Sequence, residues 1–230
     1  ERLTRQGDHA ALWTAPDLLF SQTCGYPLTH ALAGRVTLVA TPIYDCAGCG
    51  GGSYRSEIVV RADDAAGSLA ALKGRRAAVN AADSQSGCNA LRHAAMDLAD
   101  EGRFFGGIVM TGSHRASLQA VAAGEADVCA VDCVTFALLK RTQPDLTRRL
   151  RVLAQTASAP ALPYITRRDI PADDLQRLRA GLARACGEPR LSSVRAELLI
   201  AGVVVLPLSA YDRIPNMEAA AAAAGCLALT

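Results

Sequence analysis

The chain has 230 residues, enough for one large or two small domains with real cores. Half of its residues are hydrophobic and 20% are charged, which is typical of a folded protein and excludes a disordered one. The net charge of +2 comes without a long basic block, so nucleic-acid binding gains no support. The sequence contains no run of 18 apolar residues, so no membrane span is predicted, and no signal peptide is visible. Because the chain does not begin with Met, we expect a leader or a first structural segment to precede it.

Eight cysteines are many for a cytosolic protein and few for a scaffold held by disulfides. Cys46 and Cys49 form the only CxxC pair, in a glycine-rich loop. They are compatible with a disulfide, half of a zinc site or two free thiols, so a redox or metal protein is one hypothesis. No second CxxC and no nearby His pair completes a ligand set, so no metal site is predicted. Buried free thiols are expected for most of the others, and the compartment stays open.

The first third of the chain predicts strands joined by turns and short helices. Buried strands are expected at 17–22 and 36–41, with a turn into a short helix at 23–28 between them. A long glycine-rich loop over 44–53 leads to a third strand at 54–61. A brief helix at 68–74 ends at a glycine.

Strands alternate with helices over the middle of the chain, which predicts parallel α/β units. The strands are expected at 76–80, 107–111, 126–131 and 150–154, and the helices at 89–98, 115–123 and 132–139. The last part predicts a strand at 164–166, helices at 172–186 and 189–201, a strand at 203–206 and a helix at 209–224.

Two stretches resemble crossings between lobes, one near 61–64 and one over 156–163. We therefore expect an α/β protein of two lobes with a ligand cleft between them. Residues 1–61 and 158–230 form lobe 1, and residues 62–157 form an inserted lobe 2. Ligands in such sheets bind outside the carboxyl ends of the strands, which here means the cleft.

Residues 80–87 form a strand end, a hydroxyl-rich loop and a helix start, a combination that favours anion binding. The first turn of a helix has unpaired N–H groups and a positive dipole end. Ser84 and Ser86 add hydroxyl donors, and Gly87 lets the backbone approach a bound group. The alternative is that Ser84 or Ser86 is only a helix N-cap.

Four other polar residues follow or border predicted strands, namely Gln22, Tyr54, His114 and Asp132. His114 is either a donor to a bound anion or a surface loop histidine. Asp132 is a candidate N-cap that could also receive an ammonium or hydroxyl group. Tyr54 packs either on the ligand or on its own lobe.

An enzyme on the same scaffold is the main alternative, with Cys24 or His114 acting on a small phosphorylated metabolite. Cys24 and His30 lie six residues apart and could pair as nucleophile and base, but no third orienting group is evident. No GxxxxGK[ST] occurs, so the corner at 84–87 is not a nucleotide P-loop. No catalytic residue is predicted.

An ordered set of motifs resembles a known family. The set consists of Tyr54-Arg55-Ser56-Glu57-Ile58-Val59-Val60, Ser68-Leu69…Leu72-Lys73-Gly74, Asn80…Asp83-Ser84-Gln85-Ser86-Gly87, Thr111-Gly112-Ser113-His114, and Ala120-Val121…Gly124…Ala126-Asp127-Val128…Val131-Asp132. It resembles the phosphate/phosphonate-binding proteins of ABC transporters, which have the type 2 periplasmic-binding fold. The match covers about 54–165 well and the remainder loosely.

The resemblance implies ligand contacts. The serines at 84 and 86, Gln85 and His114 would hold a phosphonate or phosphate, with Gln85 standing where the family often has Thr. Tyr54 would line the other end of the ligand, and Asp132 falls near the family's acid for a ligand ammonium. A second acid would fall near Leu162, which cannot serve, and this weakens the case for an aminoalkyl-phosphonate.

The resemblance also implies a function. The chain would be a monomeric solute-binding protein without cofactor that closes by a hinge on a small oxyanion and delivers it to an ABC permease. Its location would be periplasmic, or extracytoplasmic and membrane-associated, although without a visible signal peptide a cytoplasmic location stays open. Family members begin with a strand and a helix of lobe 1, and residues 17–22 resemble the second strand. We therefore expect that first strand and helix to be missing here.

Overall fold

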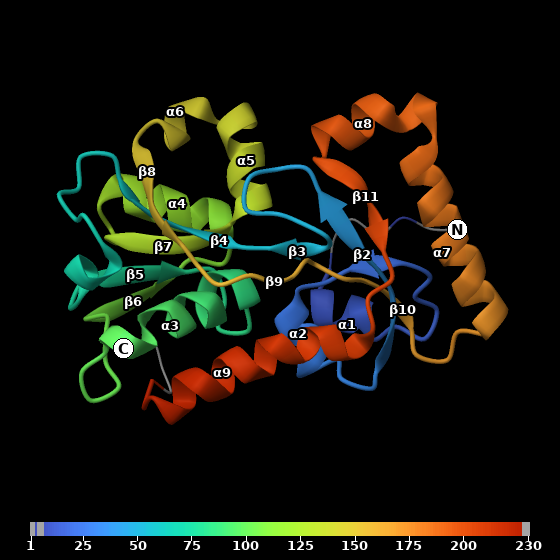
Figure 1. Ribbon diagram of the computed structural model, residues 1–230, viewed down its shortest axis with the longest axis horizontal. Coiled ribbons are helices and arrows are strands. Elements are labelled where there is room, and N and C mark those ends of the chain that lie inside the picture. The colour runs from blue at the N-terminus through green and yellow to red at the C-terminus, as the bar shows by residue number, and fades with distance from the viewer. Residues whose placement is uncertain (1–2, 4–6, 227–230) are drawn as a thin grey trace.

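A computed structural model describes residue 3 and residues 7–226. Two larger sheets flank a short two-stranded ribbon (Figure 1). The strands are β1 Ser21–Gln22, β2 Val36–Tyr44, β3 Ser53–Tyr54, β4 Ser56–Arg61, β5 Arg76–Val79, β6 Gly107–Met110, β7 Val128–Asp132, β8 Leu150–Gln155, β9 Ala159–Pro160, β10 Tyr164–Arg167 and β11 Ile200–Val204. The helices are α1 His9–Trp13, α2 Gly25–Thr29, α3 Ala90–Ala95, α4 His114–Ala123, α5 Cys133–Thr142, α6 Pro144–Thr147, α7 Ala172–Gly187, α8 Ser192–Glu197 and α9 Arg213–Ala223. Short 3₁₀ segments cover Leu69–Leu72, Met96–Leu98, Pro189–Leu191 and Leu208–Asp212, and Gln85–Asn89 is a π-helical turn.

The five-stranded sheet has the order β6-β5-β7-β4-β8. β5 runs parallel to β6 and β7, as predicted for this part of the chain, whereas β4 is antiparallel to β7 and β8. Its central strands β4, β5 and β7 are buried on both faces: Ile58 and Val60 pack on the same side as Leu91 of α3, and Val59 packs with Leu118 of α4. Because successive side chains of a strand point to opposite faces, each face of the sheet packs into its own core cluster.

The four-stranded sheet has the order β1-β10-β2-β11 and is antiparallel throughout. Helix α7 packs against β2 and β11, and α8 against β11 (Figure 1). A third core cluster contains Ile165 and Tyr211 from this side together with Tyr54 and Cys133, which adjoin the other sheet. The two sheets therefore share buried apolar surface.

Four predicted strands differ from the structure. The strand expected at 36–41 continues to Tyr44 as β2, and the strand expected at 203–206 begins earlier, at Ile200, where the sequence predicted the end of a helix. The strand expected at 17–22 is regular only over β1, because Leu19 and Phe20 are each 40% exposed and break the alternation of a half-buried strand. The strand expected at 54–61 is interrupted at Arg55: β3 pairs with β9, whereas β4 pairs with β7 and β8. Neither α1 nor β9 was predicted from the sequence.

The sheet in which β4 pairs decides where one lobe ends and the other begins. All of β4 pairs within the five-stranded sheet, whereas the prediction assigns residues 56–61 to lobe 1. Arg55 and residues 156–158 lie where the chain passes from the β3–β9 ribbon into that sheet. We propose that the two crossings lie there, so that residues 56–155 form lobe 2.

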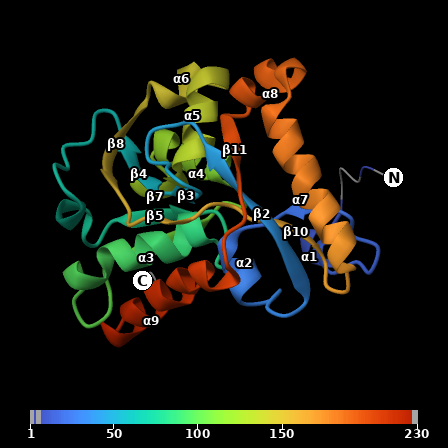
Figure 2. The ribbon, with the colours of Figure 1, turned by 45° about the vertical axis from the view of Figure 1, so that its right-hand side comes forward.

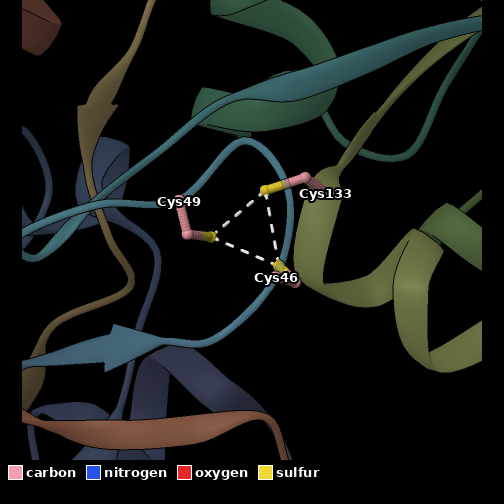
Figure 3. A group of neighbouring side chains, drawn as sticks. All are labelled: Cys46, Cys49 and Cys133. Atoms are coloured by element: carbon pink, nitrogen blue, oxygen red, sulfur yellow. Dashed lines mark hydrogen bonds between the residues drawn. The ribbon is translucent and has the colours of Figure 1, made fainter.

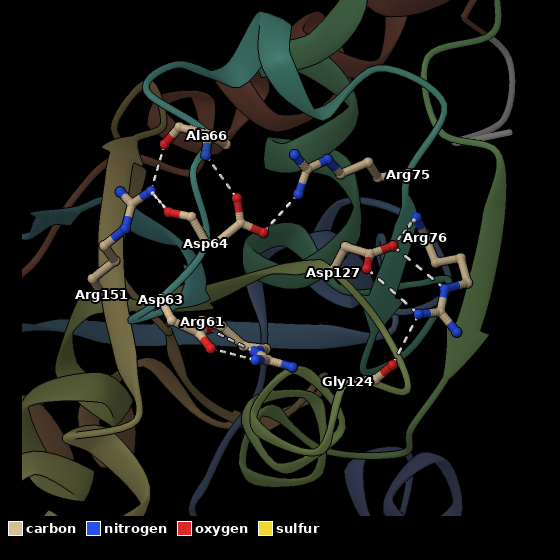
Figure 4. A network of polar contacts seen from close by, with 9 residues as sticks. All are labelled: Arg61, Asp63, Asp64, Ala66, Arg75, Arg76, Gly124, Asp127 and Arg151. Atoms are coloured by element: carbon tan, nitrogen blue, oxygen red, sulfur yellow. Dashed lines mark hydrogen bonds and ion pairs between the residues drawn. The ribbon is translucent and has the colours of Figure 1, made fainter.

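A network of ion pairs lies at the amino ends of β5 and β7 (Figure 4). Arg76 opens β5, and its backbone N–H donates to Asp127, just before β7, over 2.8 Å. Arg75 donates to Asp64 over 2.6 Å, and Arg151 donates to the carbonyls of Asp64 and Ala66. These charges satisfy one another, and they lie at the opposite ends of the strands from residues 84–87.

Helix α9 runs beside α3 and also contacts α2 (Figure 2). Glu218 of α9 accepts hydrogen bonds from Tyr26 over 2.7 Å and from Arg92 over 3.1 Å, and lies 2.8 Å from His30 Nε2. Desolvation raises the pKa of Glu218, but hydrogen bonds from these three side chains outweigh it and lower the pKa below its usual value. The C-terminal helix thereby ties α2 to α3.

Candidate oxyanion site

The corner at 84–87 is a helix N-terminus built on the end of β5. Ser84 Oγ accepts from the Gly87 N–H over 3.0 Å, and the Ser84 carbonyl accepts from Asn89 N–H over 3.0 Å. Ser84 is thus the N-cap of this helical turn, which is one of the two roles that the sequence allowed for it. Gly87 is required by close packing, since a Cβ there would lie 1.8 Å from Asn80 Oδ1 and 3.1 Å from His114 Cε1.

Ser86 is the centre of a buried polar cluster. Its Oγ lies 2.8 Å from His114 Nε2, which lies 3.4 Å from Asp132 Oδ2. Ser86 is 5% exposed and Asp132 is 4% exposed. The three residues follow β5, follow β6 and end β7, respectively, so the parallel strands bring them together at one edge of the sheet.

The charge state of the cluster follows from its burial. Desolvation lowers the pKa of His114, and this effect outweighs the opposing influences of the Asp132 charge and the Ala130 backbone. His114 is therefore neutral near pH 7 and offers one N–H donor. Asp132 caps α5 by accepting from Thr135 N–H over 2.7 Å, which leaves Oδ2 facing His114.

Tyr54 closes the cluster from the β3 ribbon. It is 2% exposed, and Ser86 lies near enough to oppose in part the effect of burial on the pKa of Tyr54. Desolvation raises the pKa of Tyr54 well above its usual value, so the phenol stays protonated. The cluster therefore contains hydroxyl donors at Ser86 and Tyr54, an imidazole N–H at His114 and one carboxylate at Asp132. Such a set can bind oxygen atoms of an anion together with one ligand O–H or N–H.

Two predicted ligand residues make other contacts. The amide of Gln85 donates to Met217 Sδ over 3.5 Å and accepts from Asn89 Nδ2 over 2.7 Å, so it faces α9. Gln22 donates to Tyr44 Oη and to the Leu162 carbonyl, both over 3.1 Å. The structure thus brings together Ser84, Ser86, Gly87, His114, Asp132 and Tyr54, while the side chains of Gln85 and Gln22 point to neighbouring partners.

Two residues that the sequence analysis had not assigned as ligands, Asn80 and Cys24, lie beside the cluster. Asn80 directly follows β5, and its buried Oδ1 finds no hydrogen-bond partner among the described residues. Its position at a strand end was a signal that could have found it. Cys24 Sγ accepts from the Gln85 N–H over 3.4 Å, and no pattern in the sequence indicated this contact.

The structure does not pair Cys24 with His30. The His30 ring stacks on Tyr26 at a centroid distance of 3.9 Å, and its Nε2 lies 2.8 Å from Glu218. Burial raises the pKa of the Cys24 thiol, which keeps it protonated and poorly nucleophilic. The proposed nucleophile and base therefore serve separate packing and ion-pair roles.

The sequence matches the model of a family described as the periplasmic substrate-binding protein of ABC phosphonate transporters, over residues 15–211. No curated protein matches the sequence. No helix in the described part of the chain is long and apolar enough to cross a membrane.

Solved structures show the fold. A binding protein component of an ABC phosphonate transporter from Pseudomonas aeruginosa has a TM-score of 0.76 and 18% identity, with 94% of this chain and 79% of that chain covered. PhnD1 from Prochlorococcus marinus, in complex with methylphosphonate, has a TM-score of 0.75 and 15% identity, with 87% and 77% covered. A Xanthomonas citri protein bound to ATP has a TM-score of 0.66 and 20% identity, with 88% and 77% covered. The expected two-lobed, type 2 periplasmic-binding fold is confirmed.

Proposed function

Because the chain belongs to the family of periplasmic substrate-binding proteins of ABC phosphonate transporters, we propose that it binds a phosphonate or phosphate between its lobes, without catalysing a reaction. The observation that carries the proposal is the buried cluster of Ser86, His114, Asp132 and Tyr54 beside the helix N-terminus at 84–87. Members of this family bind small phosphonates and work with an ABC permease.

The donors of the cluster fit the oxygens of such an anion. The hydroxyls of Ser86 and Tyr54 and the N–H of His114 come from three separate elements and supply up to three donors for the oxygens of one phosphorus. The helix N-terminus at 84–87 adds a positive partial charge.

Asp132 then selects among anions. A carboxylate repels a fully ionised oxyanion but accepts a hydrogen bond from a P–OH group or from a ligand hydroxyl or amine. Asn80 Oδ1 offers a second buried acceptor nearby. The position expected for a second acid holds Leu162, whose carbonyl accepts from Gln22. These features favour a singly protonated phosphonate or phosphate over an aminoalkyl-phosphonate.

Closure of the lobes is the proposed mechanism. Tyr54 belongs to the ribbon between the sheets, whereas Ser86, His114 and Asp132 belong to the five-stranded sheet and its helices. A ligand that bridges these groups stabilises the closed state by its differential affinity for it. The closed, monomeric complex then delivers the anion to the permease.

Thermal unfolding in the presence of methylphosphonate or inorganic phosphate tests the proposal. We expect a saturable rise in Tm for the wild type with at least one of these anions. Ser86→Asp places a second carboxylate in the cluster and should abolish the rise. Ser193→Asp, on the exposed surface of α8, is the matched control and should keep it.

Ser86→Ala guards against misfolding of the aspartate variant. It removes one hydrogen bond, worth about 1–1.5 kcal/mol, and should weaken binding about tenfold in a calorimetric titration. Undiminished stabilisation by the anion in Ser86→Asp would refute the proposed location of the site.

A further inference from the structure

Three cysteines that the candidate oxyanion site does not use gather beside it (Figure 3). Cys46 and Cys49 lie in the loop after β2, and Cys133 is the first residue of α5. The sulfur atoms are 3.4 Å apart for Cys46 and Cys49, 3.3 Å for Cys49 and Cys133, and 4.0 Å for Cys46 and Cys133. All eight cysteines of the protein are free thiols in this structure. The fold thus supplies a third sulfur, 84 residues away, to a CxxC pair that had no further ligand in the sequence.

The conformation of the loop after β2 places Cys46 and Cys49 next to Cys133. Gly48 has a φ of +90°, and a Cβ there would lie 3.2 Å from both Cβ and Sγ of Cys133. Cys49 N–H donates to the Cys46 carbonyl over 3.1 Å, which closes the turn that carries both thiols. On the other side, Cys133 N–H donates to the Arg55 carbonyl over 3.0 Å. Both partners of the contact are therefore held by backbone hydrogen bonds.

We propose that Cys46, Cys49 and Cys133 form a three-coordinate thiolate site for a soft metal ion, with Cu(I) as the ion that fits best. Thiolates select Cu(I), zinc and iron–sulfur clusters. Structural zinc and iron–sulfur sites use four protein ligands, whereas the described residues supply only these three sulfurs to the group. Of these three, Cu(I) is the one that binds stably with three thiolate ligands.

The distances suit an ion at the centre of the three sulfurs. A metal about 2.3 Å from each sulfur needs sulfur–sulfur separations of roughly 3.8–4.0 Å. The Cys46–Cys133 pair already meets this requirement, and the two shorter pairs must open by roughly half an ångström. Rotation of the side chains within a partly buried loop can supply this change.

The ligands bind as thiolates, so binding of the ion displaces the protons of the three thiols. The bound ion would join the β2 loop to α5, next to Asp132.

The test is a titration of fully reduced protein with Cu(I) in the absence of oxygen, in competition with a chromogenic Cu(I) chelator. We expect one ion per chain in the wild type, and X-ray absorption should show three sulfur neighbours. Cys133→Ser and Cys49→Ser should each weaken binding by more than about 100-fold, because losing a ligand atom costs more than losing a supporting residue. Cys186→Ser, on α7, is the matched control and should bind as the wild type does.

A folding readout distinguishes loss of the site from loss of the fold. Without metal, Cys49→Ser should melt close to the wild type, whereas Cys133→Ser places a hydroxyl in a core cluster and should melt lower. Cu(I) should raise the Tm of the wild type and of Cys186→Ser only, whatever the starting Tm of each variant. Equal Cu(I) affinity in the wild type and Cys133→Ser would overturn the proposal. So would preferential Zn²⁺ binding with no Cu(I) site, or a disulfide within the trio that forms spontaneously and resists reductant.

Discussion

At the scale of single residues, we expect a substitution at Gly87 to affect both the packing of the protein and the binding of the ligand. Replacement by Ala places a methyl group against Asn80 Oδ1 and His114, in the centre of the candidate oxyanion site. We expect Gly87→Ala to lower the free energy of unfolding by about 1–3 kcal/mol and to abolish stabilisation by methylphosphonate. Gly181→Ala in α7, where an added Cβ meets nothing within 4 Å, should be neutral or slightly stabilising. Denaturant unfolding of the two variants checks the contrast, and equal effects would argue against tight packing at Gly87.

The buried His114 predicts a pH dependence of stability. Its pKa in the folded protein lies below the value in the unfolded chain, because desolvation disfavours the charged form. The unfolded chain therefore binds the proton more readily, so stability falls as the pH drops below about 6.5. We expect His114→Gln to lose less stability between pH 7 and pH 5 than the wild type. His93, whose pKa is also lowered by burial, remains in both proteins and cancels from the comparison.

At the scale of elements, the ion-pair cluster around Glu218 links α9 to α2 and α3. Glu218→Gln keeps the size of the side chain but removes the charge that faces His30 and the nearly buried Arg92. We expect a loss on the order of 1–3 kcal/mol in the free energy of unfolding, because hydrogen bonds to charged groups are lost. Glu197→Gln, on the exposed end of α8, is the control and should change stability by less than about 0.5 kcal/mol. A similar small change in both variants would show that α9 is held by its apolar contacts alone.

The sequence predicted those elements whose causes are local. Short apolar runs that alternate with helical stretches identified β5, β6 and β7, and the polar residues after them identified Ser86, His114 and Asp132. The break at Arg55 and the β9 strand were missed because they depend on pairing between residues about 100 positions apart. The contact of Gln85 with Met217 was missed for the same reason. Cys133 could not be joined to the CxxC pair before the fold placed α5 beside the β2 loop.

At the scale of the whole molecule, the two sheets share one of the core clusters, and the β3–β9 ribbon, α9 and the contact between the β2 loop and α5 link them (Figure 2). The candidate site lies at the carboxyl ends of β5 and β7, and the ion-pair network of Arg75 and Arg76 lies at their amino ends. This division leaves one edge of the sheet for the ion-pair network and the other for the proposed site.

The most direct measurement is a crystal structure of the protein grown with methylphosphonate. We expect density for the phosphonyl group within hydrogen-bond distance of Ser86 Oγ and His114 Nε2, with one oxygen facing Asp132. The present contact of 2.8 Å between Ser86 and His114 should open to admit it. A phosphonyl group bound elsewhere, with Ser86 and His114 still paired, would contradict the account.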